Sequence, residues 1–314
     1  MKPWIFLIFA GLCLTPWARA EYALGAGIVL ALAGQAAFES HGRKLSRLLI
    51  QSSIVALGLT IDLRTVIAAG AQGMAFAAGT IIGVFALGAL LRRLLRTDAE
   101  VSVLLGAGTA ICGGSAIAAT GSVIRAAESS MSVALAAVFV LNAAALYVFP
   151  PVGHALGLTE HQFGTWAAVA IHDMSSVVAA GKSYGPAALE QATVVKLTRV
   201  LWIVPVALAA GWWFARARRA DGPAEPSPRL PVPWFVVLFL CASAARTAFP
   251  TLTGPAEVIR AAAKTAMCLA LFLIGSGLSR AALARIGWRP FAQAVMLWVT
   301  VSVAALAVVR ATVQ

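Results

Sequence analysis

Charged residues are scarce in this sequence. Only 11% of the 314 residues are charged and 61% are hydrophobic, whereas an ordinary soluble domain has about 25% charged residues. With a mean hydropathy of +0.88, the composition is that of an integral membrane protein. A spanning helix with its loop takes about 25 to 30 residues, so the chain has room for roughly ten or eleven crossings and for no soluble catalytic domain.

Cysteine and histidine are also rare, which excludes several kinds of site. All four cysteines lie inside apolar runs, where neither a disulfide framework nor a thiolate metal site is expected: Cys13, Cys112, Cys241 and Cys268. The HExxH zinc motif does not occur, and we expect no metal and no cofactor. The net charge of +12 comes from 24 basic residues dispersed over short loops, which fits orientation in a membrane and not nucleic-acid binding.

Eleven apolar runs stand between polar, glycine or proline positions. Their lengths fit bilayer-crossing helices, so the sequence predicts an all-α polytopic membrane protein with about ten or eleven transmembrane helices. The predicted spans are 4–18, 22–38, 45–60, 74–95, 101–126, 131–149, 163–182, 192–215, 232–247, 258–277 and 289–312. The first run has two interpretations, because Lys2, the apolar stretch after it and the small residues at 18 and 20 also resemble a signal peptide with its cleavage site.

Basic residues indicate how these spans are oriented. In this map 14 lysines and arginines fall on one side and 6 on the other, with 4 within or near spans. The positive-inside rule makes the richer side cytoplasmic and places the C-terminus outside. The one extended linker, residues 216–231, is rich in charge and proline and is expected to be a flexible cytoplasmic connection.

Two short internal matches predict an inverted repeat. RKLSRLL at 43–49 resembles VKLTRVL at 195–201, and Gly58 to Gly70 resembles Gly275 to Gly287. Each match relates spans of opposite direction, as in many transporters. The first match supports two consecutive five-helix units, which we favour, whereas the second requires a permuted order. The expected parts are an N-terminal segment at 1–21, a first repeat at 22–149 and a second repeat at 150–314.

The run from Gly106 to Ala119, GAGTAICGGSAIAA, is unusual for a membrane helix. Gly113 and Gly114 are adjacent in mid-span, and a glycine inside a helix costs about 1 kcal/mol relative to alanine. We expect a break here that leaves the N–H groups of a second half-helix, capped by Ser115, available to an anion. The alternative is that small residues only allow close helix packing. Thr109 and Cys112 complete the candidate substrate-binding residues of this run.

A second polar motif, AIHDMSSVVAAG, occupies residues 170–181. Asp173 is the only one of the 12 acidic residues that falls deep in a predicted span, and His172 precedes it. Ionisable residues at membrane depth usually face a cavity and mark an ion or proton pathway, so this pair is the candidate coupling-ion site. Ser175 and Ser176 are positioned to cap a half-helix and are candidate substrate ligands. The alternative is that Asp173 is only a helix cap.

Two basic residues share one helix face in VVKLTR at 194–199. Lys196 and Arg199 are three positions apart and are candidates for binding an anion or for pairing with Asp173. The alternative is that both extend to the membrane surface.

Together these motifs resemble the YeiH-type family of bacterial inner-membrane proteins, whose members are often labelled sulfate exporters. The resemblance rests on GAGTAICGGSAIAA, then Val123, Ile124 and Glu128, then AIHDMSSVVAAG, VVKLTR and GLSRAALARIGWRP, in this order from about residue 22 onward. The family commonly has alanine at Gly114 and Ala-Gln after the His-Asp pair. It is similar in turn to the cation:proton antiporter and anion transporter superfamily, which has inverted repeats and broken helices.

The resemblance implies a secondary transporter of a small anion, with sulfate or an organic sulfonate as the expected substrate, and alternating access as its mechanism. Gly113, Gly114 and Ser115 are then expected to bind the anion, and Asp173 with His172 to carry a coupling proton. The expected partners are a small inorganic or organic anion, a proton or Na⁺, the lipid bilayer of the bacterial inner membrane and a second copy of the chain.

Two other functions fit the same residues less well. A cation:proton antiporter would use Asp173 to bind the cation and leave the basic pair structural. An intramembrane hydrolase would need His172 and Asp173 to act together, but adjacent residues of a regular helix point about 100° apart.

Overall fold

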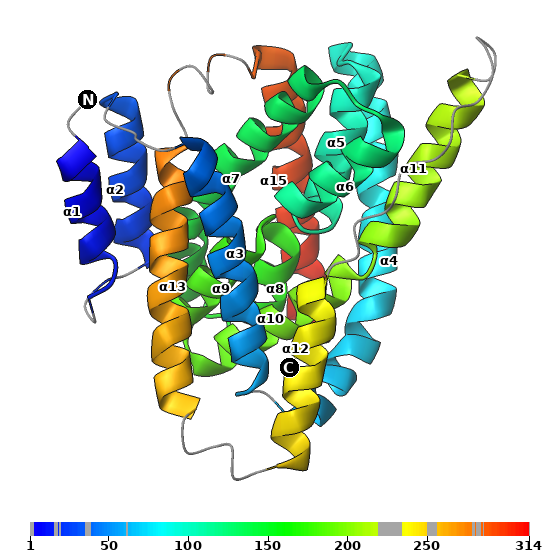
Figure 1. The fold of residues 1–314 in the computed structure, drawn as a ribbon. Helices are drawn as coiled ribbons and strands as arrows, with labels where there is room; N and C mark the ends of the chain where they lie inside the picture. Colours follow the sequence, from blue (N-terminus) through cyan, green and yellow to red (C-terminus); the bar gives the residue numbers. More distant parts are fainter. Residues whose placement is uncertain are drawn as a thin grey trace.

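The computed structural model describes residues 3–15, 18, 20–34, 39–60, 62–218, 234–249, 256–277, 280, 284 and 286–313. Regular structure in these ranges is entirely helical, which confirms the all-α architecture (Figure 1). The part of the predicted linker after Arg218 lies outside the described residues, and so do residues 278, 279, 281–283 and 285 of the motif that begins at Gly277.

The first seven helices are α1 (Pro3–Leu12), α2 (Ala20–Leu32), α3 (Glu39–Gly58), α4 (Leu63–Leu95), α5 (Ala99–Ala110), α6 (Gly114–Ile124) and α7 (Glu128–Ala155). The others are α8 (Glu160–Ala170), α9 (Met174–Tyr184), α10 (Pro186–Val200), α11 (Ile203–Arg218), α12 (Trp234–Ala248), α13 (Ala256–Ser276) and α15 (Trp288–Thr312). Among the described residues, four stretches are long and apolar enough to cross a membrane: Ala77–Leu95, Ser129–Ala155, Pro186–Arg216 and Trp288–Thr312.

The predicted spans at 4–18, 74–95 and 192–215 differ in extent from the observed helices. The run at 4–18 contains a helix of only 10 residues, which is about 15 Å long and shorter than the hydrocarbon core of a bilayer. Helix α4 begins at Leu63 and not at 74, because Asp62 caps its N-terminus by accepting a hydrogen bond from the Arg64 amide. The span at 192–215 is divided between α10 and α11, where Pro205 removes a helical N–H donor.

Helices α5 and α6 form an antiparallel hairpin. The Ala127 amide, just after α6, donates to a Glu100 carboxylate oxygen at the start of α5 at 2.9 Å. Gly121 lies opposite Leu104, and Gly108 lies opposite Ile117 near the closed end. Both open ends of this hairpin therefore lie at the same end of the bundle.

Helices α8 and α9 form a second hairpin of the same kind. The Tyr184 hydroxyl at the end of α9 donates to the Leu158 carbonyl before α8 at 2.6 Å, and its ring stacks on Phe163 at 3.8 Å. The Glu160 carboxylate accepts the amides of Ala187 and Ala188 at the start of α10. The predictions of single crossing helices at 101–126 and 163–182 are therefore wrong, although the predicted breaks near Gly113 and Asp173 are present.

The two hairpins are copies of one unit, displaced by 60 residues. Both α6 and α9 have 11 residues, and both first arms end 60 positions apart, at Ala110 and Ala170. The carboxylate of Glu100 caps the residue 27 positions later, and that of Glu160 does the same. When residues 100–127 are aligned without gaps on residues 160–187, 8 of the 28 positions carry the same residue. One of these aligned pairs is Ile111 with Ile171.

The remaining helices divide into two groups. Helices α2, α3, α12 and α13 form what we call the panel, in which α13 packs along α2 and α3 and α12 packs along α3. The hairpins, α4, α7, α10, α11 and α15 form the hairpin bundle (Figure 1). The contacts between helices repeat in the order of the second internal match, in which α3 corresponds to α13 and α4 to α15. Helix α4 packs on α5, and its counterpart α15 packs on α8. Likewise α12 packs on α3, and α2 packs on the counterpart α13. This pattern agrees with the permuted order, and the bounds 22–149 and 150–314 stay a prediction.

Candidate functional site

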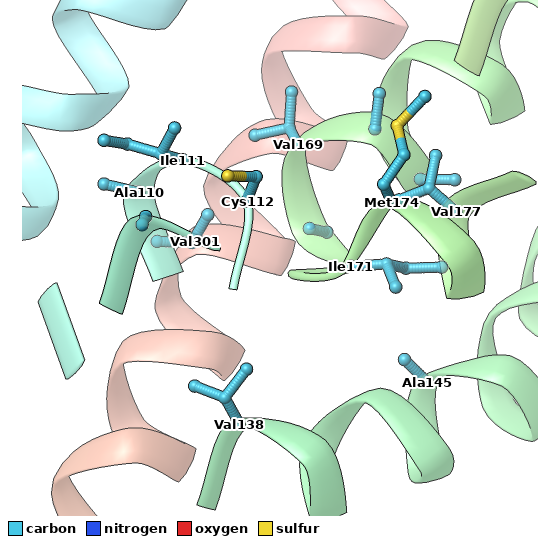
Figure 2. Packing of buried hydrophobic residues seen from close by; sticks show 14 of the residues in the cluster. Ala110, Ile111, Cys112, Val138, Ala145, Val169, Ile171, Met174, Val177 and Val301 are labelled. Atoms are coloured by element: carbon cyan, nitrogen blue, oxygen red, sulfur yellow. The ribbon is translucent and has the colours of Figure 1, made fainter. Parts of the chain in front are cut away.

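The closed ends of the two hairpins meet in the interior of the hairpin bundle. A Cβ atom placed on Gly113 would lie 3.5 Å from the backbone nitrogen and Cα of Asp173, and 3.3 Å from Val138 of α7. In Figure 2 the tip with Ile111 and Cys112 lies next to the tip with Ile171 and Met174, and Val138 and Ala145 of α7 lie below them. We call this contact of residues 111–115 with residues 171–175 the tip junction.

The first tip turns at Gly113. Its φ of +61° lies in the left-handed region, where a side chain is unfavourable, and no side chain caps the start of α6. The Cys112 sulfur and the Ser115 hydroxyl are 2.7 Å apart, so these two side chains bond to each other across the turn. The first turn of α6 therefore presents backbone N–H groups without an acidic cap.

The second tip has the acidic cap that the first lacks. Ile171 is extended, and Asp173 caps α9 by accepting the Ser175 amide at 3.0 Å as well as the Ser175 hydroxyl. Asp173 is the counterpart of Gly113, and Ser175 is the counterpart of Ser115. The two tips therefore differ in this carboxylate and in the backbone that carries it, since φ is −91° at Asp173 and +61° at Gly113. Ser176 is buried in the first turn of α9.

Asn142 of α7 holds the second tip in place. Its Oδ1 atom accepts the backbone amides of His172 and Asp173 at 3.0 and 3.1 Å. The side chain is 4% exposed, and its Nδ2 atom has no hydrogen-bond partner among the described residues. Asn142 therefore supplies the acceptor for two amides that the break in the helix leaves unpaired.

Lys196 of α10 lies against the end of α8. Its side chain is fully buried, and the Nζ atom donates to the carbonyls of Ala168 at 3.2 Å and Ile171 at 2.8 Å. The last carbonyls of a helix carry a partial negative charge, so the ammonium stabilises the end of the first arm.

Arg199 does the same for the end of α5. Its guanidinium donates to the carbonyl of Ala110 and, at 2.8 Å, to the hydroxyl of Thr80 on α4. The side chain is 1% exposed. Among the described side chains, Lys196 and Arg199 donate to carbonyl and hydroxyl oxygens and to no carboxylate. The burial of both side chains contradicts the alternative that they extend to the membrane surface, whereas anion binding and pairing with Asp173 stay predictions.

Several buried polar atoms near the junction have no partner within the described part of the chain. Both ring nitrogens of His172, the hydroxyl of Thr109 and the Nε atom of Arg199 are of this kind. Native interiors pair nearly all such atoms with protein, water or ligand. At the same place Gly114 and Asp173 are partly exposed and Ser115 is exposed. The junction is thus polar in its interior and open at one edge.

A family model described as Conserved hypothetical protein 698 matches residues 18–294. The chain belongs to this family. The UPF0324 membrane protein of Bdellovibrio bacteriovorus is 43% identical over 300 residues, which cover 95% of this chain and 90% of the relative. The UPF0324 membrane protein of Bacteroides thetaiotaomicron is 42% identical over 295 residues, covering 93% and 86%. That of Vibrio parahaemolyticus is 40% identical over 294 residues, covering 94% of each chain. No solved structure matches the chain.

The UPF0324 relatives are named as membrane proteins, and the resemblance to the YeiH-type family is confirmed. In this member of the UPF0324 family, residues predicted from three separate motifs lie within one site. Sequence reasoning missed two of its residues, Asn142 and Thr80. Asn142 is the only asparagine in the chain and interrupts an apolar run. A single polar residue in such a run could have marked it as a candidate site residue.

Proposed function

We propose that this protein is a secondary transporter of a small anion, which binds at the tip junction. The observation that carries the proposal is the burial of Lys196 and Arg199 beside two half-helices that begin at the same place, with no carboxylate among the described side chains accepting a hydrogen bond from either. Ionisable residues at membrane depth usually mark the path of a substrate or ion, and half-helix N-termini attract anionic groups.

The charges at the junction support an anion over a cation. A helix terminus carries about half an elementary charge, positive at its start and negative at its end. The ends of α5 and α8 therefore offset about one of the two charges of Lys196 and Arg199, and the starts of α6 and α9 add back about one. With Asp173 ionised the net charge is about +1, and a proton on Asp173 raises it to about +2.

The same tally suggests how transport is coupled to protons. A proton on Asp173 makes the junction more positive and so favours the anion, and a bound anion favours the proton by the same factor. Asp173 is partly exposed at the edge of the junction, where water can reach it. We assign Asp173 the coupling proton, with His172 as a second proton site, and Na⁺ as the alternative coupling ion.

Alternating access would move the hairpin bundle relative to the panel. Both tips belong to the bundle, and re-entrant tips that meet at mid-depth are a common way to place a site between two openings. We propose a multi-pass position in the bacterial inner membrane with the basic loops in the cytoplasm. The first hairpin returns to the side on which it begins, so Arg125 lies on the cytoplasmic side with Arg96. The counts of lysines and arginines on the cytoplasmic and outer sides therefore change from 14 and 6 to 15 and 5.

A cation:proton antiporter is the second candidate, and the partly exposed Asp173 carboxylate is the observation in its favour. A hydrolase is less consistent with the geometry. Ser175 contacts Asp173 directly, whereas a catalytic triad requires the histidine between the serine and the carboxylate.

Transport by purified protein in proteoliposomes tests the proposal. Radiolabelled sulfate, methanesulfonate, phosphate and acetate are supplied one at a time, with and without a pH gradient. At least one anion should accumulate faster than in protein-free vesicles, and the gradient should increase its accumulation. Exchange of Na⁺ or Li⁺ for protons with no movement of any anion would replace this proposal with the antiporter.

A further inference from the structure

Asn142 carries a hydrogen-bond donor that the fold does not use. Its Oδ1 atom accepts two tip amides, which fixes the orientation of the side-chain amide. Its Nδ2 atom carries two donors, lies in a side chain that is 4% exposed, and bonds to nothing within the described residues. An unpaired amide donor in an apolar interior costs free energy, so the position of Nδ2 indicates that a ligand group accepts a hydrogen bond from it.

The position of Nδ2 follows from the helix that carries it. Val138 lies one turn before Asn142 on the same face of α7 and is within 3.3 Å of a Cβ placed on Gly113. Asn142 itself contacts the backbone of Asp173. Its amide group therefore lies at the second tip, one helical turn along α7 from the residue that contacts Gly113.

The repeat indicates what belongs at the start of α6. At the start of α9, one carboxylate oxygen of Asp173 accepts the Ser175 amide and hydroxyl. At the start of α6 the counterpart of Asp173 is Gly113, which has no side chain, while the counterpart of Ser175 is again a serine, Ser115. Both half-helices thus have a serine at their second position, but the carboxylate occurs once.

We propose that one oxyanion group of the transported substrate binds at the start of α6, in the position equivalent to that of the Asp173 carboxylate, and that Asn142 Nδ2 donates to it. The inference rests on the proposed function and names the chemical class of its substrate. The ligand carries a carboxylate, sulfonate or sulfate group, with one oxygen for the amide and hydroxyl of Ser115, as Asp173 provides for Ser175, and another oxygen for Asn142. Asn142 is then both the positioning residue of the second tip and a substrate-binding residue.

The variant Asn142→Asp separates these two roles. It keeps an oxygen that accepts the amides of His172 and Asp173, and it replaces the Nδ2 donor with a second, negatively charged oxygen. Binding of the four radiolabelled anions is measured for purified wild type and variant at neutral and alkaline pH, together with the melting temperature. We expect Asn142→Asp to melt near the wild-type temperature and to lose at least about a hundredfold in affinity for the anion that the wild type binds. Asn142→Ala, which loses both roles, should melt lower.

Two further variants keep the result decisive. Gln191→Glu places the same new charge on α10 away from the junction, where the side chain bonds to Thr165, and should bind the anion as the wild type does. Ser115→Ala alters an exposed side chain at the start of α6 and should lower anion affinity about fivefold without a change in melting temperature. This variant tests the location of the site even where Asn142→Asp folds poorly.

Wild-type affinity in both Asn142→Asp and Ser115→Ala would overturn this inference and leave the proposed transporter function unchanged. A wild-type protein that neither binds nor moves any of the four anions would overturn the proposed function, and this inference with it.

Discussion

At the scale of single residues, the tip junction is organised by side chains that complete interrupted helices. Lys196 and Arg199 bond to the last carbonyls of α8 and α5, and Asn142 bonds to the amides between α8 and α9. These side chains replace the hydrogen bonds that a continuous helix would have made. Polar groups that look like a binding site in the sequence therefore also hold the fold together.

Lys196 should accordingly affect stability as well as binding. The variant Lys196→Met keeps the length of the side chain but leaves the carbonyls of Ala168 and Ile171 without their donor. Each unsatisfied buried acceptor costs about 1–3 kcal/mol, so the melting temperature should fall, and loss of the charge should weaken anion binding. Lys196→Arg is the control that retains the charge. Wild-type melting and affinity in Lys196→Met would contradict both roles.

Asp173 should affect coupling more than folding. Asparagine caps a helix about as well as aspartate, so Asp173→Asn should keep the Ser175 contact and the melting temperature. With its charge fixed at zero, the junction should bind the anion at every pH as the protonated wild type does, and pH-driven accumulation should fail. Affinity measured across pH, together with uptake with and without a gradient, distinguishes this from a capping role. Full gradient-driven uptake by the asparagine variant would remove Asp173 from the coupling mechanism.

At the scale of elements, the hairpins decide which residues lie on the same side of the membrane. The contact between Glu100 and Ala127 returns the end of α6 to the side where α5 began. Ser122 at the end of α6 should therefore be accessible from the side of Arg93, and Lys182 at the end of α9 from the opposite side. Ser122→Cys, Arg93→Cys and Lys182→Cys, each made with the exposed Cys241 changed to serine, can be labelled in oriented vesicles with an impermeant thiol reagent. Labelling of Ser122→Cys and Lys182→Cys from one side would contradict the hairpins.

The sequence predicted where the helices break but not where the chain goes afterwards. Adjacent glycines at 113 and 114, and the pair His172–Asp173, are local signals that a helix cannot continue. The direction of the next half-helix is not local, because α5 and α6 together cover residues 99–124, about the length of one crossing helix with the same composition. Asn142 escaped prediction for a related reason, since its partners lie 30 and 31 positions away.

At the scale of the whole molecule, the panel and the hairpin bundle are candidates for the two bodies of a transporter. The helices at the junction all belong to the bundle, and the panel contributes none of its residues. The two groups meet at several places, and at one of them Gly25 of α2 faces Tyr147 of α7, whose hydroxyl lies 2.7 Å from the position of a Cβ on Gly25. If transport requires the groups to move past each other, a link at this place should stop it.

The last prediction tests that motion. The double variant Gly25→Cys with Tyr147→Cys, in a background with Cys241→Ser, is treated in proteoliposomes with a flexible bifunctional methanethiosulfonate. Uptake of the transported anion should fall to the level of protein-free vesicles and should recover when a reductant cleaves the link, because binding alone cannot carry the anion across. The matched control links Gly42→Cys of α3 to Leu273→Cys of α13, which face each other within the panel, and should leave uptake unchanged. Equal uptake before and after the Gly25–Tyr147 link, with the link verified by mass spectrometry, would mean that the hairpins move within the bundle while the panel stays attached to α7.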